Sequence, residues 1–95
     1  MTITWQGSRI DTRDCERLAQ RFTSDWRGDW LYTEYMLLSP WGHLLYYRVG
    51  NWNRRMNGEC KGWWWAERNY GISLDGFELL NRPALVNMRL VKPQE

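Results

Sequence analysis

The residues that build most metal and redox sites are scarce in this chain. Its 95 residues include two cysteines and one histidine. Cys15, His43 and Cys60 are therefore the only soft ligands, and they form no Cys-x-x-Cys motif or histidine pair, so we predict no metal site. Two cysteines allow one disulfide at most. Because nothing indicates secretion, we expect both thiols to be free.

Long apolar runs and targeting signals are also missing. No apolar stretch approaches the roughly 20 residues that a membrane-spanning helix needs, and residues 1–9 carry no basic-then-apolar signal pattern. We therefore expect a cytoplasmic protein with no membrane partner. There is no repeat, linker or low-complexity segment, and the length suits one globular domain over residues 1–95. Aromatic residues at 16% supply burial that a disordered chain lacks.

Lysine is scarce, with two lysines against eleven arginines and a net charge of +2. A net charge this small gives little long-range attraction toward nucleic acid. Arginine, more than lysine, suits forked hydrogen bonding to carboxylates or phosphates and stacking on aromatic rings. The alternative is that the arginines pair with the eleven acids on a solvated surface, where ion pairs contribute little to stability.

Tryptophan, in contrast, is abundant. Eight residues are tryptophan, and Trp63, Trp64 and Trp65 are consecutive. We expect a strand over residues 63–68, in which these side chains would alternate between the two faces of a sheet. A sheet with one face in water cannot bury all three indoles. Either both faces are covered, or an indole is left exposed for a partner.

The pattern of apolar and turn residues predicts an α+β fold. We expect an antiparallel sheet of about four strands, with one longer N-terminal helix and one short helix packed on it. The clearest element is a hairpin over residues 30–38 and 43–49, joined by the turn Ser39-Pro40-Trp41-Gly42. Strand-like segments also occupy residues 1–6 and 84–91.

Two helices are expected from spacing and capping residues. The longer helix would begin after its cap and run to about residue 22, since Ile10, Cys15, Leu18, Ala19 and Phe22 fall on one helical face. Ser8 or Asp11 would cap it. The short helix would cover residues 74–80, with Ser73 as its cap and Arg82-Pro83 ending it.

The N-terminal arginines have a regular spacing. Arg9, Arg13, Arg17 and Arg21 recur every four residues, which on a helix forms one ridge. We take this ridge as a secondary partner-binding candidate that would contact an acidic surface. The alternative is an ordinary solvated helix face.

The segment from residue 46 to residue 68 combines aromatic and basic residues. It carries a net charge of +3, whereas residues 1–40 carry −1. Its main partner-binding candidates are Trp52, Arg54, Arg55, Lys61, Trp63, Trp64, Trp65 and Arg68. Tryptophan beside arginine is typical of binding hot spots, and stacking rings beside cations also suit single-stranded nucleic acid. Core packing and carbohydrate stacking are the other interpretations of the same residues.

We expect a small non-enzymatic protein-binding module, an inhibitor or modulator that sterically blocks a larger protein or nucleoprotein complex. The profile of one short domain, surplus aromatics and no cofactor or catalytic motif resembles small phage proteins that disable host machinery, such as anti-CRISPR proteins. A single-stranded nucleic-acid binder is the first alternative, and a small enzyme centred on Cys60 or His43 is the second. A homodimer could also cover the surplus aromatic surface.

Overall fold

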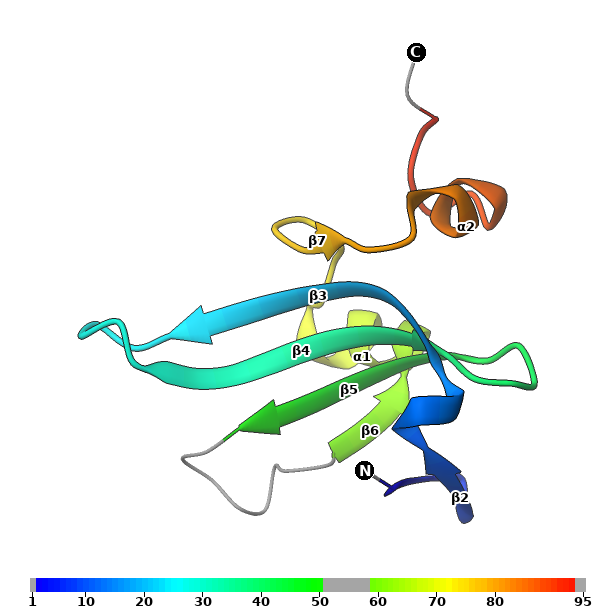
Figure 1. The fold of residues 1–95 in the computed structure, drawn as a ribbon, viewed down its shortest axis with the longest axis horizontal. Coiled ribbons are helices and arrows are strands. Elements are labelled where there is room, and N and C mark those ends of the chain that lie inside the picture. Colours follow the sequence, from blue (N-terminus) through cyan, green and yellow to red (C-terminus); the bar gives the residue numbers. More distant parts are fainter. Residues whose placement is uncertain (1, 51–58, 94–95) are drawn as a thin grey trace.

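The chain folds into two antiparallel sheets and two short helices (Figure 1). The computed structural model describes residues 2–50 and 59–93. Its elements in chain order are β1 (Thr2–Trp5), β2 (Ser8–Asp11), the 3-10 turn η1 (Thr12–Asp14), β3 (Glu16–Ser24), β4 (Trp30–Leu38), β5 (Leu44–Gly50), β6 (Glu59–Gly62), α1 (Trp63–Tyr70), β7 (Glu78–Leu79) and α2 (Arg82–Asn87).

Five of the strands form one antiparallel sheet in the order β6-β5-β4-β3-β7, and β1 pairs with β2 in a separate hairpin. The predicted hairpin over residues 30–38 and 43–49 is confirmed as β4 and β5, which pair from Leu38–Leu44 to Tyr32–Gly50. Its turn is closed by the amide of Gly42, which donates to the carbonyl oxygen of Ser39 at 3.0 Å. The turn chemistry of proline and glycine therefore determined this element locally.

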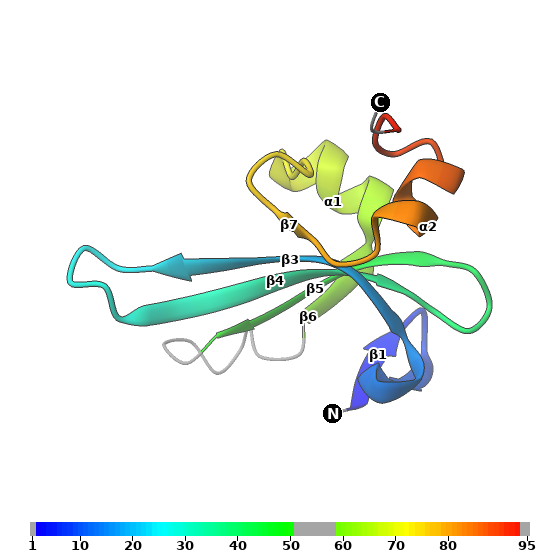
Figure 2. The same ribbon diagram turned by 45° about the horizontal axis from the view of Figure 1, so that its top comes forward.

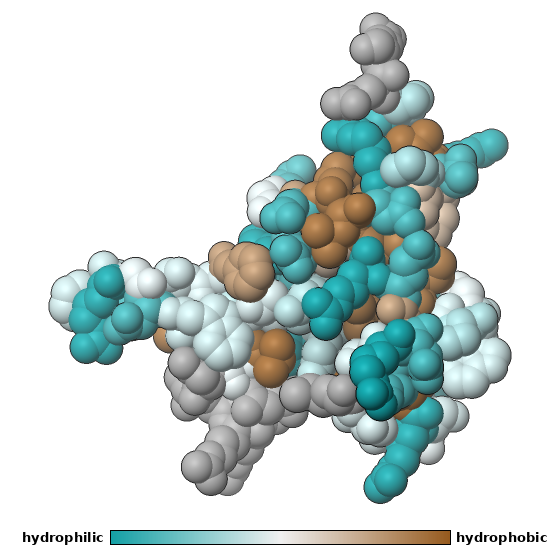
Figure 3. All heavy atoms as spheres, in the orientation of Figure 1, coloured by the Kyte–Doolittle hydropathy of each residue, from teal (hydrophilic) through white to brown (hydrophobic). Residues whose placement is uncertain are grey.

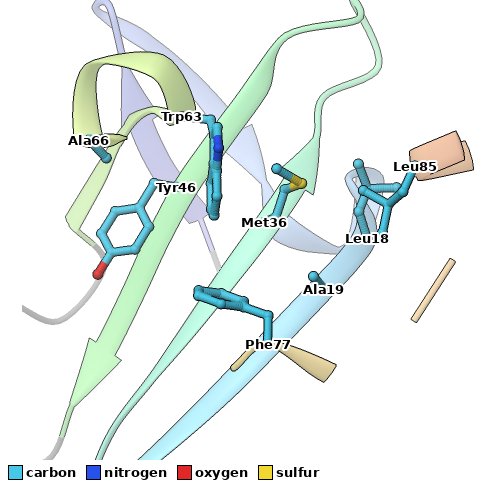
Figure 4. Packing of buried hydrophobic residues seen from close by; sticks show 8 residues of the cluster. All are labelled: Leu18, Ala19, Met36, Tyr46, Trp63, Ala66, Phe77 and Leu85. Atoms are coloured by element: carbon cyan, nitrogen blue, oxygen red, sulfur yellow. The ribbon is translucent and has the colours of Figure 1, made fainter. Parts of the chain in front are cut away.

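Both faces of the large sheet are covered, as Figure 2 shows: α1 and α2 lie on one face, and the β1–β2 hairpin lies on the other. Each cover encloses its own core. The helix-side core contains Leu18, Ala19, Met36, Tyr46, Trp63, Ala66, Phe77 and Leu85 (Figure 4). The hairpin-side core contains Ile3, Ile10, Cys15, Leu37, Leu45 and Tyr47.

The predicted N-terminal helix is wrong, because the segment forms mostly strand. Residues 8–11 are β2, residues 16–24 are β3, and only the single turn η1 lies between them. Gln6 and Gly7 both have positive φ, 50° and 80°, between the paired residues Trp5 and Ser8. A two-residue hairpin turn of this kind needs positive φ at both positions, which glycine adopts without strain. Asp11 does act as an N-cap, but only for η1, by accepting from the amide of Arg13.

The apolar spacing that indicated a helix is produced by a β-bulge. Arg17 pairs with Leu37 and Ala19 pairs with Met36, so Leu18 is an extra residue in β3. Such a bulge places two neighbouring residues opposite one and changes which face the following residues occupy. As a result Cys15 enters the hairpin-side core, whereas Leu18 and Ala19 enter the helix-side core.

The tryptophan triplet opens a helix, which corrects the predicted strand over residues 63–68. Gly62 precedes α1, and Gly71 follows it with a left-handed φ of 68°. A glycine at that position ends a helix without steric cost. The buried residues of α1 are Trp63 and Ala66, so one side of the helix lies on the sheet.

The C-terminal predictions are also corrected. Residues 78–79 form the short strand β7 where a helix was expected, and α2 occupies residues 82–87, which include the first half of the strand expected over residues 84–91. The side chain of Asn81 accepts from the amide of Ala84, and Pro83 stands in the first turn. Proline there begins a helix, since its missing N–H would have no partner inside the helix.

The outer surface differs between the two ends of the sheet. In the view of Figure 3, hydrophobic side chains gather over β7 and α2, whereas the tip of the β3–β4 hairpin is hydrophilic. Among the described residues, no helix is long and apolar enough to cross a membrane.

Replacing Trp63 should destabilise the fold far more than replacing its neighbour. Trp63 is 1% exposed, and its ring contacts Tyr46 and Phe77 at centroid distances of 6.1 and 5.7 Å. We expect Trp63→Ala to lower the free energy of unfolding by about 3–5 kcal/mol, because it leaves a cavity. Trp64→Ala should cost under about 1 kcal/mol. Urea denaturation followed by circular dichroism measures both, and equal losses would contradict this account of α1.

Candidate functional site

Five aromatic rings meet at one end of the molecule. We call the surface formed by Trp5, Trp41, His43, Trp64 and Trp65 the aromatic end. Trp5 ends β1, Trp41 and His43 belong to the β4–β5 turn, and Trp64 and Trp65 lie in the first turn of α1. The β4–β5 turn lies at the right of Figure 1, opposite the tip of the β3–β4 hairpin, and shared hollows join it to Trp5 and to the start of α1. Residues from three distant parts of the sequence therefore build one surface.

Shallow hollows separate these rings, and Trp5 borders each of them. One hollow of about 420 Å³ lies between Trp5, His43, Trp64 and Trp65. A second of about 430 Å³ is bordered by Trp5, Lys61 and Trp65, and a third of about 190 Å³ by Trp5, Trp41 and His43. Because the three hollows share lining residues, the aromatic end is one continuous surface.

Three of the five rings at this end pack against a neighbouring ring, and the most exposed indoles remain accessible. Trp5 and His43 pack with centroids 4.7 Å apart, and Trp65 meets the ring of Tyr70 edge-on at 5.1 Å. Trp41, Trp64 and Trp65 are nevertheless 66%, 54% and 46% exposed. A large apolar surface left in water is typical of a binding site, and the restrained ring of Trp65 has little freedom to lose on binding.

A cation stands on the same surface. The Lys61 ammonium lies 5.0 Å from the centroid of the Trp65 ring, and Arg68 is exposed one helical turn beyond Trp64. Glu67, also exposed, is the acid between them in the sequence. The net charge of Lys61, Glu67 and Arg68 beside the aromatic end is therefore only +1.

The structure divides the main predicted binding residues. Lys61, Trp64, Trp65 and Arg68 are on or beside the aromatic end, whereas Trp63 is buried in the helix-side core (Figure 4). Trp52, Arg54 and Arg55 lie outside the described residues. Trp5, Trp41 and His43 were not predicted as binding residues, since no sequence pattern links them to α1.

The predicted arginine ridge does not form. Arg9 lies on β2 and Arg13 in η1, where Arg13 pairs with Asp11 at 2.7 Å and lowers the pKa of that carboxyl through a hydrogen bond. The bulge in β3 then turns Arg17 and Arg21 to opposite faces of the sheet. Arg17 lies 4.8 Å above the ring of Tyr35. Arg21 lies on the helix side, where it pairs with Glu34 at 2.8 Å.

The two cysteines are poor nucleophiles in this setting. Cys15 is buried, and Cys60 is half-buried against the same hairpin-side core. Burial raises the pKa of Cys15, and burial together with the nearby Cys15 raises the pKa of Cys60 to about 12. Because the thiolate is the reactive form, this setting disfavours covalent chemistry at Cys60. Among the described residues, no three potential metal ligands of the His, Cys, Asp or Glu type come together.

Comparisons of this chain with protein-family models, with curated proteins and with solved structures found no match. The aromatic end is thus the feature from which a function has to be inferred.

Alkylation should confirm that the thiols are unreactive. At pH 8 we expect iodoacetamide to modify Cys60 in the folded protein on the order of a hundredfold more slowly than in the chain unfolded by urea, because a higher pKa leaves less thiolate. Mass spectrometry of timed samples measures both rates. Equal rates would restore Cys60 as a candidate nucleophile.

Proposed function

We propose that this chain is a non-enzymatic binding module that attaches to another protein through the aromatic end. The observation that carries the proposal is the meeting of Trp5, Trp41, His43, Trp64 and Trp65 around shared hollows, with three indoles about half exposed. Single exposed tryptophans are unremarkable on a protein surface, but a contiguous group marks an interaction site.

The chemistry of the aromatic end suits a protein partner. Desolvating indole rings supplies affinity, and hollows between them accept protruding side chains of the partner. Lys61 and Arg68 at the margin orient the complex through charged contacts at its rim. Such a module acts by covering its partner's surface. This mode of action is the one expected of a small inhibitor or modulator, and the short, aromatic-rich chain resembles phage anti-defence proteins in these respects.

A single-stranded nucleic acid is the second candidate. The position of Lys61 over Trp65 favours it, because bases stack on such rings while cations contact the phosphates. Against it stands the small net charge of the surface, because the cations Lys61 and Arg68 are accompanied by the exposed acid Glu67. Binding of this class weakens steeply with salt, so the two candidates separate by experiment.

Replacing one indole of the aromatic end should weaken partner capture while changing the stability of the fold little. The full-length protein, its Trp64→Ala variant and its Trp26→Ala variant would each be immobilised and exposed to a lysate of the producing or host cell. Trp26 is the matched control, since it is 90% exposed at the opposite hairpin tip. We expect Trp64→Ala to weaken capture of a specific protein by about 30-fold, as hot-spot truncations do. Trp26→Ala should retain it.

Three results would contradict the proposal. The first is that the Trp64→Ala variant captures the same protein as strongly as the unaltered chain does, while the two chains have the same melting temperature. The second is saturable quenching of tryptophan emission by a short single-stranded oligonucleotide that weakens with salt, which would favour nucleic acid. The third is a dimer by sedimentation that Trp64→Ala converts to monomer, which would mean that a second copy covers this surface.

A further inference from the structure

One edge of the large sheet is only partly covered. β7 pairs with β3 at Ala19 and Gln20 alone, and among the described residues no other strand pairs with that edge. Figures 1 and 2 both show β3 extending past β7 toward the tip of its hairpin with β4. The outer half of β3, residues 21–24, therefore presents an open strand edge, which we call the β3 edge.

The backbone of the β3 edge has hydrogen-bonding groups that point away from the molecule. In an antiparallel ladder, successive residues turn their N–H and C=O groups alternately to one neighbouring strand and to the other. The amide of Asp25 donates to the carbonyl oxygen of Asp29 at 2.8 Å, so Asp25 faces the returning chain. The same alternation turns the backbone groups of Ser24 and Phe22 outward, where a further strand would meet them.

The β3 edge lacks the features that usually keep sheet edges apart. Proteins protect such edges with lysine, proline, bulges or a covering segment, because an unpaired strand can join a strand of another chain. Phe22, Thr23 and Ser24 supply neither charge nor proline, and the irregularity at this end of the hairpin lies in β4, where Leu31 is the extra residue. Phe22 is also 61% exposed. The edge is therefore suited to pairing.

We infer that two copies of this chain pair through the β3 edge, antiparallel about a two-fold axis at Thr23, so that their sheets join into one. In this register Phe22 of each copy pairs with Ser24 of the other, which forms about four backbone hydrogen bonds between residues that face outward. β7 occupies the edge at Gln20, and the turn begins after Asp25. This register pairs all the outward-facing residues without displacing β7.

The side chains on the hairpin side of the sheet match in this register. Phe22 and Ser24 lie on that side, and Ser24 has Trp30 as its neighbour on β4. Serine is too small to cover the indole, and Trp30 stays 39% exposed. Phe22 of the second copy lies beside Ser24, in line with this ring, so pairing removes apolar surface of both copies from water.

The side chains on the helix side have opposite charges where they meet. Arg21 of each copy faces Asp25 of the other, and cross-strand pairs of opposite charge favour a register. Arg21 keeps its bond to Glu34, and Asp25 keeps its bond to the amide of Arg27, so these charges select the register and add little affinity. A strand of another protein offers the same backbone bonds. The matches on both faces are built into this chain, however, which is why we assign a second copy as the occupant.

The dimer leaves the aromatic end exposed, because the β3 edge lies toward the opposite end of the sheet (Figure 1). The pairing itself does not depend on the function proposed for that surface. Together with that proposed function, it gives a bivalent module with one aromatic end at each outer end of the joined sheet. Two sites on one body strengthen attachment to a partner that is itself paired.

Sedimentation velocity of the full-length protein tests the dimer without any partner. Between about 10 μM and about 1 mM we expect a change from monomer to dimer. Phe22→Lys should weaken dimerisation at least about tenfold, because it removes the ring and places a charge on the edge. Its melting temperature should change little, since Phe22 is largely exposed.

Leu80→Lys is the matched control. Leu80 is also an exposed apolar residue, 41% accessible, but its amide bonds to Leu18 beside the covered half of β3. This variant should dimerise as the unaltered protein does. A protein that stays monomeric over the whole range, or one that Phe22→Lys and Leu80→Lys affect equally, would overturn the inference. A dimer lost in Trp64→Ala and kept in Phe22→Lys would overturn it as well, because the aromatic end would then be the interface.

A cysteine at the axis tests the register. The two Thr23 residues would form a non-hydrogen-bonded pair with Cα atoms about 4.5 Å apart, a distance that a disulfide spans. With copper phenanthroline and air, two Thr23→Cys thiols would give up two protons and two electrons to oxygen and form this bond. We expect a cross-linked dimer on non-reducing gels on the order of tenfold faster than for Thr2→Cys, which is exposed on β1. Equal rates, or cross-linking that persists when Phe22→Lys is added, would contradict the pairing about Thr23.

Discussion

Burial of Trp63 at the first position of α1 is the contact on which the aromatic end depends. Successive residues of a helix point about 100° apart. A helix that buries Trp63 and Ala66 against the sheet must therefore turn Trp64 and Trp65 toward solvent. Two indoles are exposed because the third is packed, and the short helix between Gly62 and Gly71 has no other face on which to hide them.

Coverage of both faces of the sheet lets so small a chain build two cores and still expose the aromatic end. The β1–β2 hairpin covers one face and brings Trp5 beside Gly62 and α1, where the aromatic end forms. On the other face, α1 and α2 cover an apolar core, while Glu34 lies beyond it, in register with Arg21 and Arg48. A buried carboxylate is tolerated there because Arg21 and Tyr46 satisfy both of its oxygens.

The elements that were predicted correctly are those fixed by neighbouring residues. The β4–β5 hairpin follows from two segments rich in aromatic and aliphatic residues on either side of a Pro-Trp-Gly turn. The N-terminal helix failed because a strand with a bulge at Leu18 can mimic helical spacing, although the Gln6-Gly7 turn was a readable hairpin signal. At the C-terminus, Pro83 was interpreted as ending one helix, whereas after the cap Asn81 it begins another.

The sequence by itself determined the surplus of tryptophan, the β4–β5 hairpin and the candidacy of Trp64 and Trp65 for binding. The tertiary structure alone decided that Trp63 is core, that Trp5, Trp41 and His43 join the exposed indoles, and that Arg21, Glu34 and Arg48 stand in one row. The physical reason is the distance along the sequence over which each interaction acts. Turns and alternation act over a few residues, whereas the register of three strands and the packing of a helix bring together side chains that are tens of residues apart.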